Sequence, residues 1–246
     1  MSATWIDKDE DRTIAKWKCS LPADCPVEIV GKPKIVYRGQ WTRTVEVHYR
    51  KRNSKKEEVS QSIHRKEISP GRAHGVEVIA ILHKAGKRYF VFVKEYRIPP
   101  AGYCFEFPAG LLEEGETVID AARRELKEET GYTASKVICL SEERHPMAPQ
   151  LTDNSISYAI AEINGDSLEN QNPKMHLDEA EIIEVVEVEC NKALAYVQSI
   201  STKVNVDGMV VEIECNKALA YVQSISNKVN VDGMVYAFLL GYNAKF

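Results

Sequence analysis

The residues best suited to chemistry lie in a short acidic segment that begins at Gly110 and ends at Tyr132. Within it, Glu125, Glu128 and Glu129 are three and four positions apart, so on a helix they project from one side. Like charges at this spacing repel by about 0.2–0.5 kcal/mol per pair even on an exposed helix. A bound hard cation best explains such a cluster beside an apolar face. The fixed positions of the segment are Gly110, Glu116, Arg124, Glu125, Glu128, Glu129 and Gly131.

The type of ligand determines which cation to expect. Sites that offer only oxygen ligands favour Mg²⁺, or Mn²⁺, over zinc. Mg²⁺ keeps several of its waters and shares its coordination shell with substrate phosphates. The loop 107–111, which leads into the acidic segment, can add a backbone carbonyl to the same site. The pattern therefore predicts a site for Mg²⁺ or Mn²⁺.

The acidic segment resembles the signature of the Nudix hydrolases at each of its charged and glycine positions. Tyr132 stands where an aliphatic residue is more usual. The flanking sequences VKEYRIPP (93–100) and GYCFEFPAG (102–110) are similar to those of the ADP-sugar pyrophosphatases, the Nudix subgroup that splits ADP-ribose. Pro149, which lies 17 residues past Tyr132, matches a proline of that subgroup. The resemblance implies metal-dependent cleavage of a diphosphate.

The resemblance runs over about residues 76–189 plus the last helix, is weaker over 34–72 and is absent from 1–30. It implies an α/β fold, the Nudix α-β-α sandwich with a mixed sheet, preceded by a small antiparallel β-rich N-terminal domain. We place the domains at 1–73, with 1–30 poorly defined, and at 74–246. The N-terminal domain of this subgroup is a swapped dimerisation module. We therefore expect a homodimer in which residues 34–72 line the partner's substrate site.

Carried over to this chain, the family pattern assigns a metal site and catalytic groups. Glu125 and Glu129 match the main metal ligands, and Ala109 matches the residue whose backbone carbonyl joins them. Glu128 is expected to be a further ligand or to orient water. Glu181 aligns with a late glutamate that contacts the metal and its waters and acts as the base. A solvated strand residue is the alternative reading of Glu181.

The same resemblance assigns the substrate contacts of the second domain. Arg97 matches the arginine that grips the substrate phosphate, with a surface ion pair as the alternative. Glu106 is expected to orient the substrate, and Leu111 to line its site. Glu116 and Arg124 are expected to tie the loop to the helix rather than to do chemistry.

The N-terminal domain departs from the subgroup where adenine is held. After residues 42–44 the family pattern has a tryptophan, whereas this chain has Val45. Glu46 and Arg50 still match substrate-binding positions. Three nearby aromatic residues could replace the tryptophan, or could instead be core residues: Trp41, Tyr37 and Tyr49. We assign the contact with the substrate to Trp41.

These assignments imply metal-assisted hydrolysis of a nucleoside diphosphate sugar, with ADP-ribose yielding AMP and ribose 5-phosphate. Two alternatives stay open: cleavage of an oxidised nucleoside diphosphate in the same site, and a nucleotide sensor that binds without turnover. The intact acidic cluster disfavours the sensor, because binding alone does not require it. RNA is disfavoured as a partner, because the basic stretch lacks regularly interleaved aromatic residues for stacking.

Alternating and apolar segments predict the strands that must position these residues. Residues 44–49 alternate within a β-rich stretch, 34–67, which the polar residues 50–58 interrupt. The turn 85–88 is expected to join two strong strands in a hairpin. The strands expected in the second domain are 76–82, 89–93, 103–107, 136–140, 155–163 and 181–189.

One clear helix is predicted over residues 118–130. Thr117 and Asp120 have the spacing of a capping box, and Gly131 is placed to end the helix. The face that we expect to pack on the sheet consists of Ile119, Ala122 and Leu126.

The C-terminal part contains a near-identical tandem repeat, with copy one at 186–210 and copy two at 211–235. Two copies do not make a solenoid, and a core position of a single domain has room for one of them. We interpret the repeat as a recent duplication or a gene-model error, and expect one copy to loop out or pack peripherally. The only differences between the copies are Val188 against Ile213 and Thr202 against Asn227.

Charge and composition exclude several other classes of protein. The net charge of −4 combines a basic stretch, 32–72, with an acidic one, 110–132, and the basic stretch suits an anionic substrate. The longest apolar run, 234–240, is far shorter than the roughly 20 residues of a membrane span. The 6 cysteines include no CxxC pair, and the N-terminus resembles neither a secretory signal nor a transit peptide. These features predict a reducing compartment, the cytoplasm or the nucleus.

Overall fold

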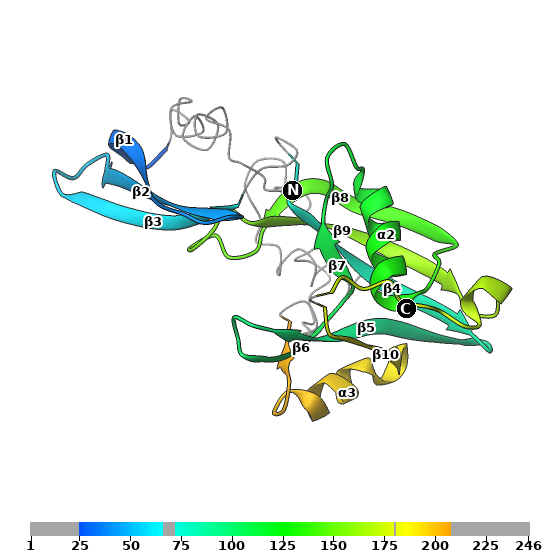
Figure 1. The fold of residues 1–246 in the computed structure, drawn as a ribbon. Coiled ribbons are helices and arrows are strands. Elements are labelled where there is room, and N and C mark those ends of the chain that lie inside the picture. Colours follow the sequence, from blue (N-terminus) through cyan, green and yellow to red (C-terminus); the bar gives the residue numbers. More distant parts are fainter. Residues whose placement is uncertain (1–24, 66–71, 180, 208–246) are drawn as a thin grey trace. The chain divides into compact units, whose positions relative to one another are not determined.

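A computed structural model describes residues 25–65, 72–179 and 181–207 (Figure 1). Its contacts divide the chain into two compact units. The first unit spans 1–68 together with 146–154, and the second spans 69–145 together with 155–246. Within the described ranges, no helix combines the length and the apolar composition that crossing a bilayer requires.

The first unit is built on a three-stranded antiparallel sheet in the order β1-β2-β3. In the first part of β2 every second residue is buried, namely Arg43, Val45 and Val47, as expected for a strand with one face on a core. This confirms the antiparallel sheet predicted from residues 34–67, although β1 begins earlier than expected. Residues 1–24 lie outside the described part of the chain. The strands are β1 (Val27–Arg38), β2 (Thr42–Lys51) and β3 (Glu57–Arg65).

Segment 146–154 is bound to β3 by side-chain and backbone hydrogen bonds. His64 is buried, and its Nδ1 lies 2.8 Å from Asp153 Oδ2 while its Nε2 lies 2.7 Å from Ser62 Oγ. Ile63 N donates to Leu151 O at 2.9 Å. The segment that carries Pro149 is therefore part of the first unit.

The second unit contains an eight-stranded mixed sheet in the order β11-β6-β5-β4-β9-β8, to which β10 adds at β5 and β7 at β4. β4 and β9 are parallel, as are β11 and β6, and the other described pairings are antiparallel. The strands are β4 (Gly75–Lys84), β5 (Lys87–Arg97), β6 (Gly102–Glu106), β7 (Ala109–Leu111), β8 (Lys136–Pro146), β9 (Ser155–Asn164), β10 (Ile183–Glu189) and β11 (Asn205–Val206). The helices are α2 (Val118–Thr130) and α3 (Ala193–Ile200), with short 3₁₀ turns at η1 (Leu168–Asn170) and η2 (Cys190–Lys192).

Two hydrophobic cores lie on opposite faces of this sheet, one with α2 and one with α3 (Figure 1). Strand β4 feeds both, because successive side chains point to opposite faces. Val76 and Val78 belong to the core with α2, whereas Ile79 and Ile81 belong to the core with α3. The α-β-α arrangement with a mixed sheet is confirmed.

The hairpin predicted between β4 and β5 is confirmed, but its turn is shorter than the expected 85–88, because Lys87 and Arg88 already pair with β4. Ala85 and Gly86 both have positive φ, 50° and 73°. Two consecutive residues of this kind form the type I′ turn, which matches the twist of the flanking strands.

Helix α2 begins and ends where the sequence predicts. Thr117 Oγ1 accepts a hydrogen bond from Asp120 N at 3.1 Å, and Gly131 ends the helix with φ of 75°. The predicted packing face is wrong at one position, because Ile119 is 37% exposed. The buried apolar stripe is displaced by about one residue, since buried carboxylates occupy the neighbouring side of the helix. It consists of Val118, Ala121, Ala122 and Leu126.

Copy one of the tandem repeat, residues 186–210, is an integral part of the second unit. It supplies most of β10 and all of α3 and β11. Val188 and Val197 are buried in the core with α3. Copy two, residues 211–235, lies outside the described part of the chain.

We expect a chain that lacks residues 211–235 to keep its Mg²⁺-dependent activity and to gain solubility or melting temperature, because copy one by itself supplies β10, α3 and β11. Activity, solubility and Tm of both chains test this. Deleting 186–210 is the matched control, because the two shortened chains differ only where Val188 and Thr202 stand. Isoleucine adds a methyl group at the buried Val188 position, so the control should be the less stable chain. Loss of folding or of hydrolysis in both would show that two copies are required.

Candidate active site

The loop before α2 is held by β4, and this pairing sets the direction of the Ala109 backbone. Ala109 stands opposite Glu77 in the antiparallel pair of β7 and β4. The neighbouring residues, Val78 of β4 and Pro108, are hydrogen-bonded to each other, with Val78 N donating to Pro108 O at 2.8 Å. Because cross-strand bonds alternate along an antiparallel pair, the N–H and C=O groups of Ala109 point away from β4. The N–H group donates to Glu129 Oε2 at 3.1 Å, which leaves the carbonyl directed to the same side.

Gly110 allows the loop to lie directly against α2. A Cβ atom at this position would lie 2.0 Å from the carboxyl carbon of Glu125, so only glycine leaves room for that carboxylate. Glu129 follows about one helical turn later, and both glutamates are buried. The structure therefore brings Ala109, Glu125 and Glu129 together, as the family resemblance of the sequence predicts.

The two buried carboxylates have strongly perturbed ionisation. Burial, followed by the charge of Glu125, raises the pKa of Glu129 to about 9, against the opposing effect of the Ala109 N–H group. Burial also raises the pKa of Glu125, against the favourable bond from Arg124. Negative charge is thus crowded in a poorly solvated site, which is the setting that a divalent cation relieves.

Glu181 and Glu128 accompany this pair in different ways. The charge of Glu181 raises the pKa of both Glu125 and Glu129, so its carboxylate lies within electrostatic reach of them. Glu128 lies at the rim, where its side chain is 41% exposed and Oε2 accepts from Arg124 Nη1 at 3.0 Å. The charge of Glu128 also raises the pKa of Glu125, more than that of Glu181 does, whereas only Glu181 of the two acts on Glu129.

Arg124 fastens the loop to the helix, which confirms the structural role predicted for it and for Glu116. Its Nε and Nη2 atoms donate to the two carboxylate oxygens of Glu116, each at 2.9 Å. Nη2 also donates to Leu111 O at 2.9 Å, and Nη1 to Glu125 Oε1 at 2.6 Å. The same guanidinium therefore holds the loop and orients a carboxylate of the candidate metal site.

Arg97 is held between two acidic side chains beside the buried pair. Its Nη2 donates to Glu106 Oε2 at 2.7 Å, and its Nη1 lies 2.9 Å from Glu95 Oε2. Burial alone would lower the pKa of Arg97, but the bonds and charges of Glu106, Glu95 and Glu129 outweigh burial and raise it. This setting differs from that of an ordinary surface ion pair.

Two buried acidic residues of this region were missed in the sequence. Glu95 is buried beside Arg97, and Glu77 is buried opposite Ala109. The available signal was a carboxylate within an otherwise apolar strand, most clearly Glu77 in the sequence GVEVIAIL. Aspartate and glutamate are almost never fully buried unless they are paired.

The substrate-binding residues assigned to the first unit all belong to its sheet or the turn before β2. Glu46 is hydrogen-bonded within the sheet, and Arg50 Nε donates to Glu28 Oε2 at 2.8 Å. Val45 is 0% exposed, so the position where the subgroup has tryptophan is a core position in this chain. Trp41 is 58% exposed and is therefore accessible to a ligand.

The donor groups fit a hydrated Mg²⁺ or Mn²⁺ ion rather than a fully enclosed one. Among the described residues, no three acidic, histidine or cysteine side chains are already close enough to enclose a metal ion. Mg²⁺ seldom needs such a cage, because it binds through one or two carboxylates, its own waters and substrate phosphates. Glu125, Glu129 and the Ala109 carbonyl provide that donor set.

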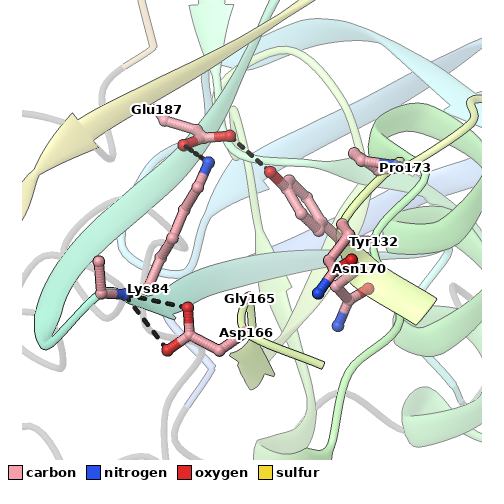
Figure 2. A pocket seen from close by; sticks show the side chains of 9 residues that line it. Lys84, Tyr132, Gly165, Asp166, Asn170, Pro173 and Glu187 are labelled. Atoms are coloured by element: carbon pink, nitrogen blue, oxygen red, sulfur yellow. Dashed lines mark hydrogen bonds and ion pairs between the residues drawn. The ribbon is translucent and has the colours of Figure 1, made fainter. Parts of the chain in front are cut away.

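A separate pocket of about 510 Å³ lies at the far end of β4 (Figure 2). There the Tyr132 hydroxyl donates to Glu187, which also accepts from Lys84 Nζ at 3.2 Å. Burial, followed by the bond to Glu187, raises the pKa of Tyr132, so the phenol keeps its proton. Tyrosine at this signature position therefore adds a bond between the end of α2 and β10 that an aliphatic residue cannot make.

Comparison with known proteins agrees with this geometry. Residues 73–203 match the family described as NUDIX domain. The Caenorhabditis elegans protein named "Putative nudix hydrolase 2" is 40% identical over 198 residues, which cover 80% of this chain and 86% of that protein. The "ADP-ribose pyrophosphatase" of Saccharomyces cerevisiae is 35% identical over 158 residues, which cover 62% of this chain and 66% of that protein.

A solved structure supports the same fold. The crystal structure of an ADP compounds hydrolase superposes with a TM-score of 0.54 at 21% identity, covering 70% of this chain and 83% of that one. The domain match spans more than half of the chain, and the nematode relative covers most of it. The chain therefore belongs to the Nudix family of hydrolases.

Proposed function

We propose that the protein hydrolyses the diphosphate bond of ADP-ribose and other ADP-sugars to AMP and a sugar phosphate in a Mg²⁺-dependent reaction, with Mn²⁺ as an alternative ion. The observation that carries the proposal is the buried pair Glu125 and Glu129 facing the Ala109 loop. The substrate class is supported by the Saccharomyces cerevisiae relative, whose name is ADP-ribose pyrophosphatase.

In this proposal Glu125, Glu129 and the Ala109 carbonyl hold the ion, with Glu128 adjusting its waters from the rim. When bound, the ion neutralises phosphate charge and lowers the pKa of the attacking water. Glu181 accepts the proton of that water. Its Oε2 already accepts from Asp178 N at 2.9 Å, which orients the carboxylate and leaves Oε1 for the proton.

Substrate contacts follow from the charges around this pair. Arg97 exchanges part of its contact with Glu106 for a phosphate oxygen, and Glu106 then orients the sugar or the pyrophosphate. Leu111, which is 44% exposed, lines the site beside them. Bidentate arginine contacts suit phosphate because the planar guanidinium matches its oxygens.

Assaying the purified chain with Mg²⁺ against a panel of nucleoside diphosphate derivatives tests the function. The panel includes ADP-ribose, other ADP-sugars and an oxidised nucleoside diphosphate, with products identified by ³¹P NMR. We expect AMP and ribose 5-phosphate from ADP-ribose at the highest kcat/KM. Preference for the oxidised nucleotide would replace the proposed substrate, and binding without turnover of any compound would indicate a sensor.

We further propose a homodimer in which the first unit of each subunit lines the other's substrate site, with Trp41, Glu46 and Arg50 as contacts. Exposed apolar side chains on the first unit support an interface, notably Tyr37 at 65% exposed and Trp41. Light scattering at assay concentration is expected to give twice the mass of the chain. A fully active monomer would contradict this arrangement.

The cytoplasm or nucleus is the compartment that we propose for this activity. The cysteines in the described ranges are all free thiols, and free thiols persist where glutathione and thioredoxin keep them reduced.

A further inference from the structure

Glu95 is a buried carboxylate to which the proposed reaction assigns no role. It lies near the end of β5, two residues before Arg97, and is 7% exposed. Its Oε2 atom lies 2.9 Å from Arg97 Nη1. Carboxylates are almost never buried unless they are paired, so the ion pair with Arg97 accounts for an acidic side chain at this position of the sheet.

The pairing of β5 with β6 places Glu95, Arg97 and Glu106 on one face of the sheet. Glu95 and Arg97 share a face because they are two residues apart on a strand. Glu106 stands opposite Val93, and directly opposed residues also share a face. Because Val93 precedes Glu95 along β5, the Arg97 side chain runs back along the strand past Glu95 to bring its Nη2 atom 2.7 Å from Glu106 Oε2.

This face of β5 is the one on which α2 packs. Val91, which has the same alternation along the strand as Glu95 and Arg97, belongs to the core with α2. The charge of Glu129 raises the pKa of Arg97, so the guanidinium lies within electrostatic reach of the candidate metal site. The Arg97 side chain is 39% exposed and is therefore accessible to a substrate phosphate.

The two carboxylates that hold Arg97 differ in the part that each can play. Glu106 is only partly buried and accepts from Nε and Nη2, the contact that Arg97 gives up in part when it binds a phosphate oxygen. Glu95 is buried beneath the side chain and faces Nη1. Its contact remains during that exchange, and it restrains a side chain that otherwise samples many rotamers.

We propose that Glu95 is a positioning residue for diphosphate hydrolysis, which holds Arg97 Nη1 so that the rest of the guanidinium faces the substrate phosphate. The inference rests on the proposed function, because it assigns a further residue to the same substrate site. Glu95 contacts neither the cation nor the substrate and acts through Arg97. It therefore contributes to substrate binding and not to metal affinity.

Binding of a substrate analogue that cannot be hydrolysed tests this role without turnover. The probe is α,β-methylene ADP-ribose, titrated calorimetrically in Mg²⁺ into the full chain and its variants. Glu95→Leu keeps the volume of the side chain but has no acceptor, so we expect about tenfold weaker binding or more, as for loss of a bond to a charged group. Glu95→Gln keeps an acceptor for Nη1 and is expected to recover most of the affinity.

Glu184→Leu is the matched control. Glu184 lies on the neighbouring strand β10 opposite Lys94, and its Oε2 accepts from Lys94 Nζ at 2.8 Å. Its side chain is 65% exposed, so the same substitution removes an ion pair with β5 at the surface. This variant is expected to bind the analogue as the wild type does.

Kinetics on ADP-ribose separate positioning from a general structural role. We expect Glu95→Leu to raise KM more than it lowers kcat, because an interaction made equally in the bound substrate and the transition state contributes to KM. In the Arg97→Gln background, Glu95→Leu should change kcat/KM by less than about twofold, since the two residues act as one unit. A full additional loss in that background would show that Glu95 acts independently of Arg97 and would overturn the inference.

Mn²⁺ binding without substrate, followed by electron paramagnetic resonance, shows whether Glu95 belongs to the metal site instead. We expect Glu95→Leu to bind Mn²⁺ as the wild type does, whereas Glu129→Gln binds it more weakly. Equal weakening in both variants would overturn the positioning role.

The remaining outcomes separate this inference from the proposed function. Turnover by the wild type with unchanged analogue binding in Glu95→Leu, or with Glu95→Gln as weak as Glu95→Leu, would overturn the inference and leave the function standing. A wild type that neither binds the analogue nor hydrolyses ADP-ribose would overturn both. Failure of both Glu95 variants to fold would also overturn the inference, because a group that acts only through Arg97 is dispensable for folding.

Discussion

The Glu129→Gln variant is expected to lose Mg²⁺-dependent turnover while it keeps its fold. Glu129 is buried beside Glu125, and the Ala109 N–H group fixes its Oε2 atom at 3.1 Å. Glutamine has the same shape but lacks the charge that a hard cation requires from its ligand. Steady-state kinetics at saturating Mg²⁺ measure the loss, with Glu114→Gln as an exposed control in the same acidic segment.

The size of the residual activity decides the assignment. If Glu129→Gln keeps about a tenth or more of the wild-type kcat, the lost stabilisation of the transition state is less than about 1.4 kcal/mol. Glu129 would then not be a principal ligand. Circular dichroism of the variant excludes misfolding as the cause of a larger loss.

Metal-free stability provides an independent check on the same residue. The pKa of Glu129 is raised from 4.5 to about 9 in the folded chain, so between these values the folded state binds a proton that the unfolded state has released. The free energy of unfolding contributed by this group is therefore fully present below pH 4.5 and is lost as the pH rises through about 9. Chemical denaturation in EDTA should show this decline in the wild type, and a smaller decline in Glu129→Gln.

A single added methyl group at Gly110 should be nearly as damaging as the loss of a ligand. The Cβ atom of Gly110→Ala would lie 2.0 Å from the carboxyl carbon of Glu125, and 2.0 Å and 2.3 Å from its oxygens. The Glu125 carboxylate is the end of a flexible side chain, so it moves rather than the backbone. We therefore expect kcat and Mn²⁺ affinity to fall by about tenfold or more, with little change in Tm.

Gly39→Ala is the steric control for this experiment, because the nearest heavy atom to its new methyl group lies at 3.2 Å and the position belongs to the first unit. It should keep both activity and metal affinity. Normal Mn²⁺ binding by Gly110→Ala would mean that Glu125 is not held against the loop in the working enzyme.

Several local features of this protein were determined by the sequence by itself. The helix Val118–Thr130 and its two caps were predicted at the correct residues, because Thr117 and Gly131 act on neighbouring backbone groups. The Ala85–Gly86 hairpin was also predicted, since its positive φ angles depend on local sterics. The pairing of Glu116 with Arg124 was expected from the family resemblance.

Other features were decided only by tertiary structure. The exposure of Ile119 depends on which side of α2 faces the loop and sheet, and helical spacing alone did not resolve an offset of one residue. The attachment of 146–154 to β3 joins residues about 90 positions apart, through His64 and Asp153. No periodicity in a sequence specifies such a contact.

Some residues of the candidate site could likewise be identified from the sequence, and others only from the tertiary structure. Spacing along one helix identified Glu125 and Glu129, because their separation is fixed by the helix itself. Glu77 came to lie opposite Ala109 only when β4 paired with β7, and the burial of Glu95 beside Arg97 likewise depends on the elements packed around β5. Charge on a helix face can be read from local periodicity, whereas the cost of burying a strand carboxylate depends on the neighbours that the complete fold places around it.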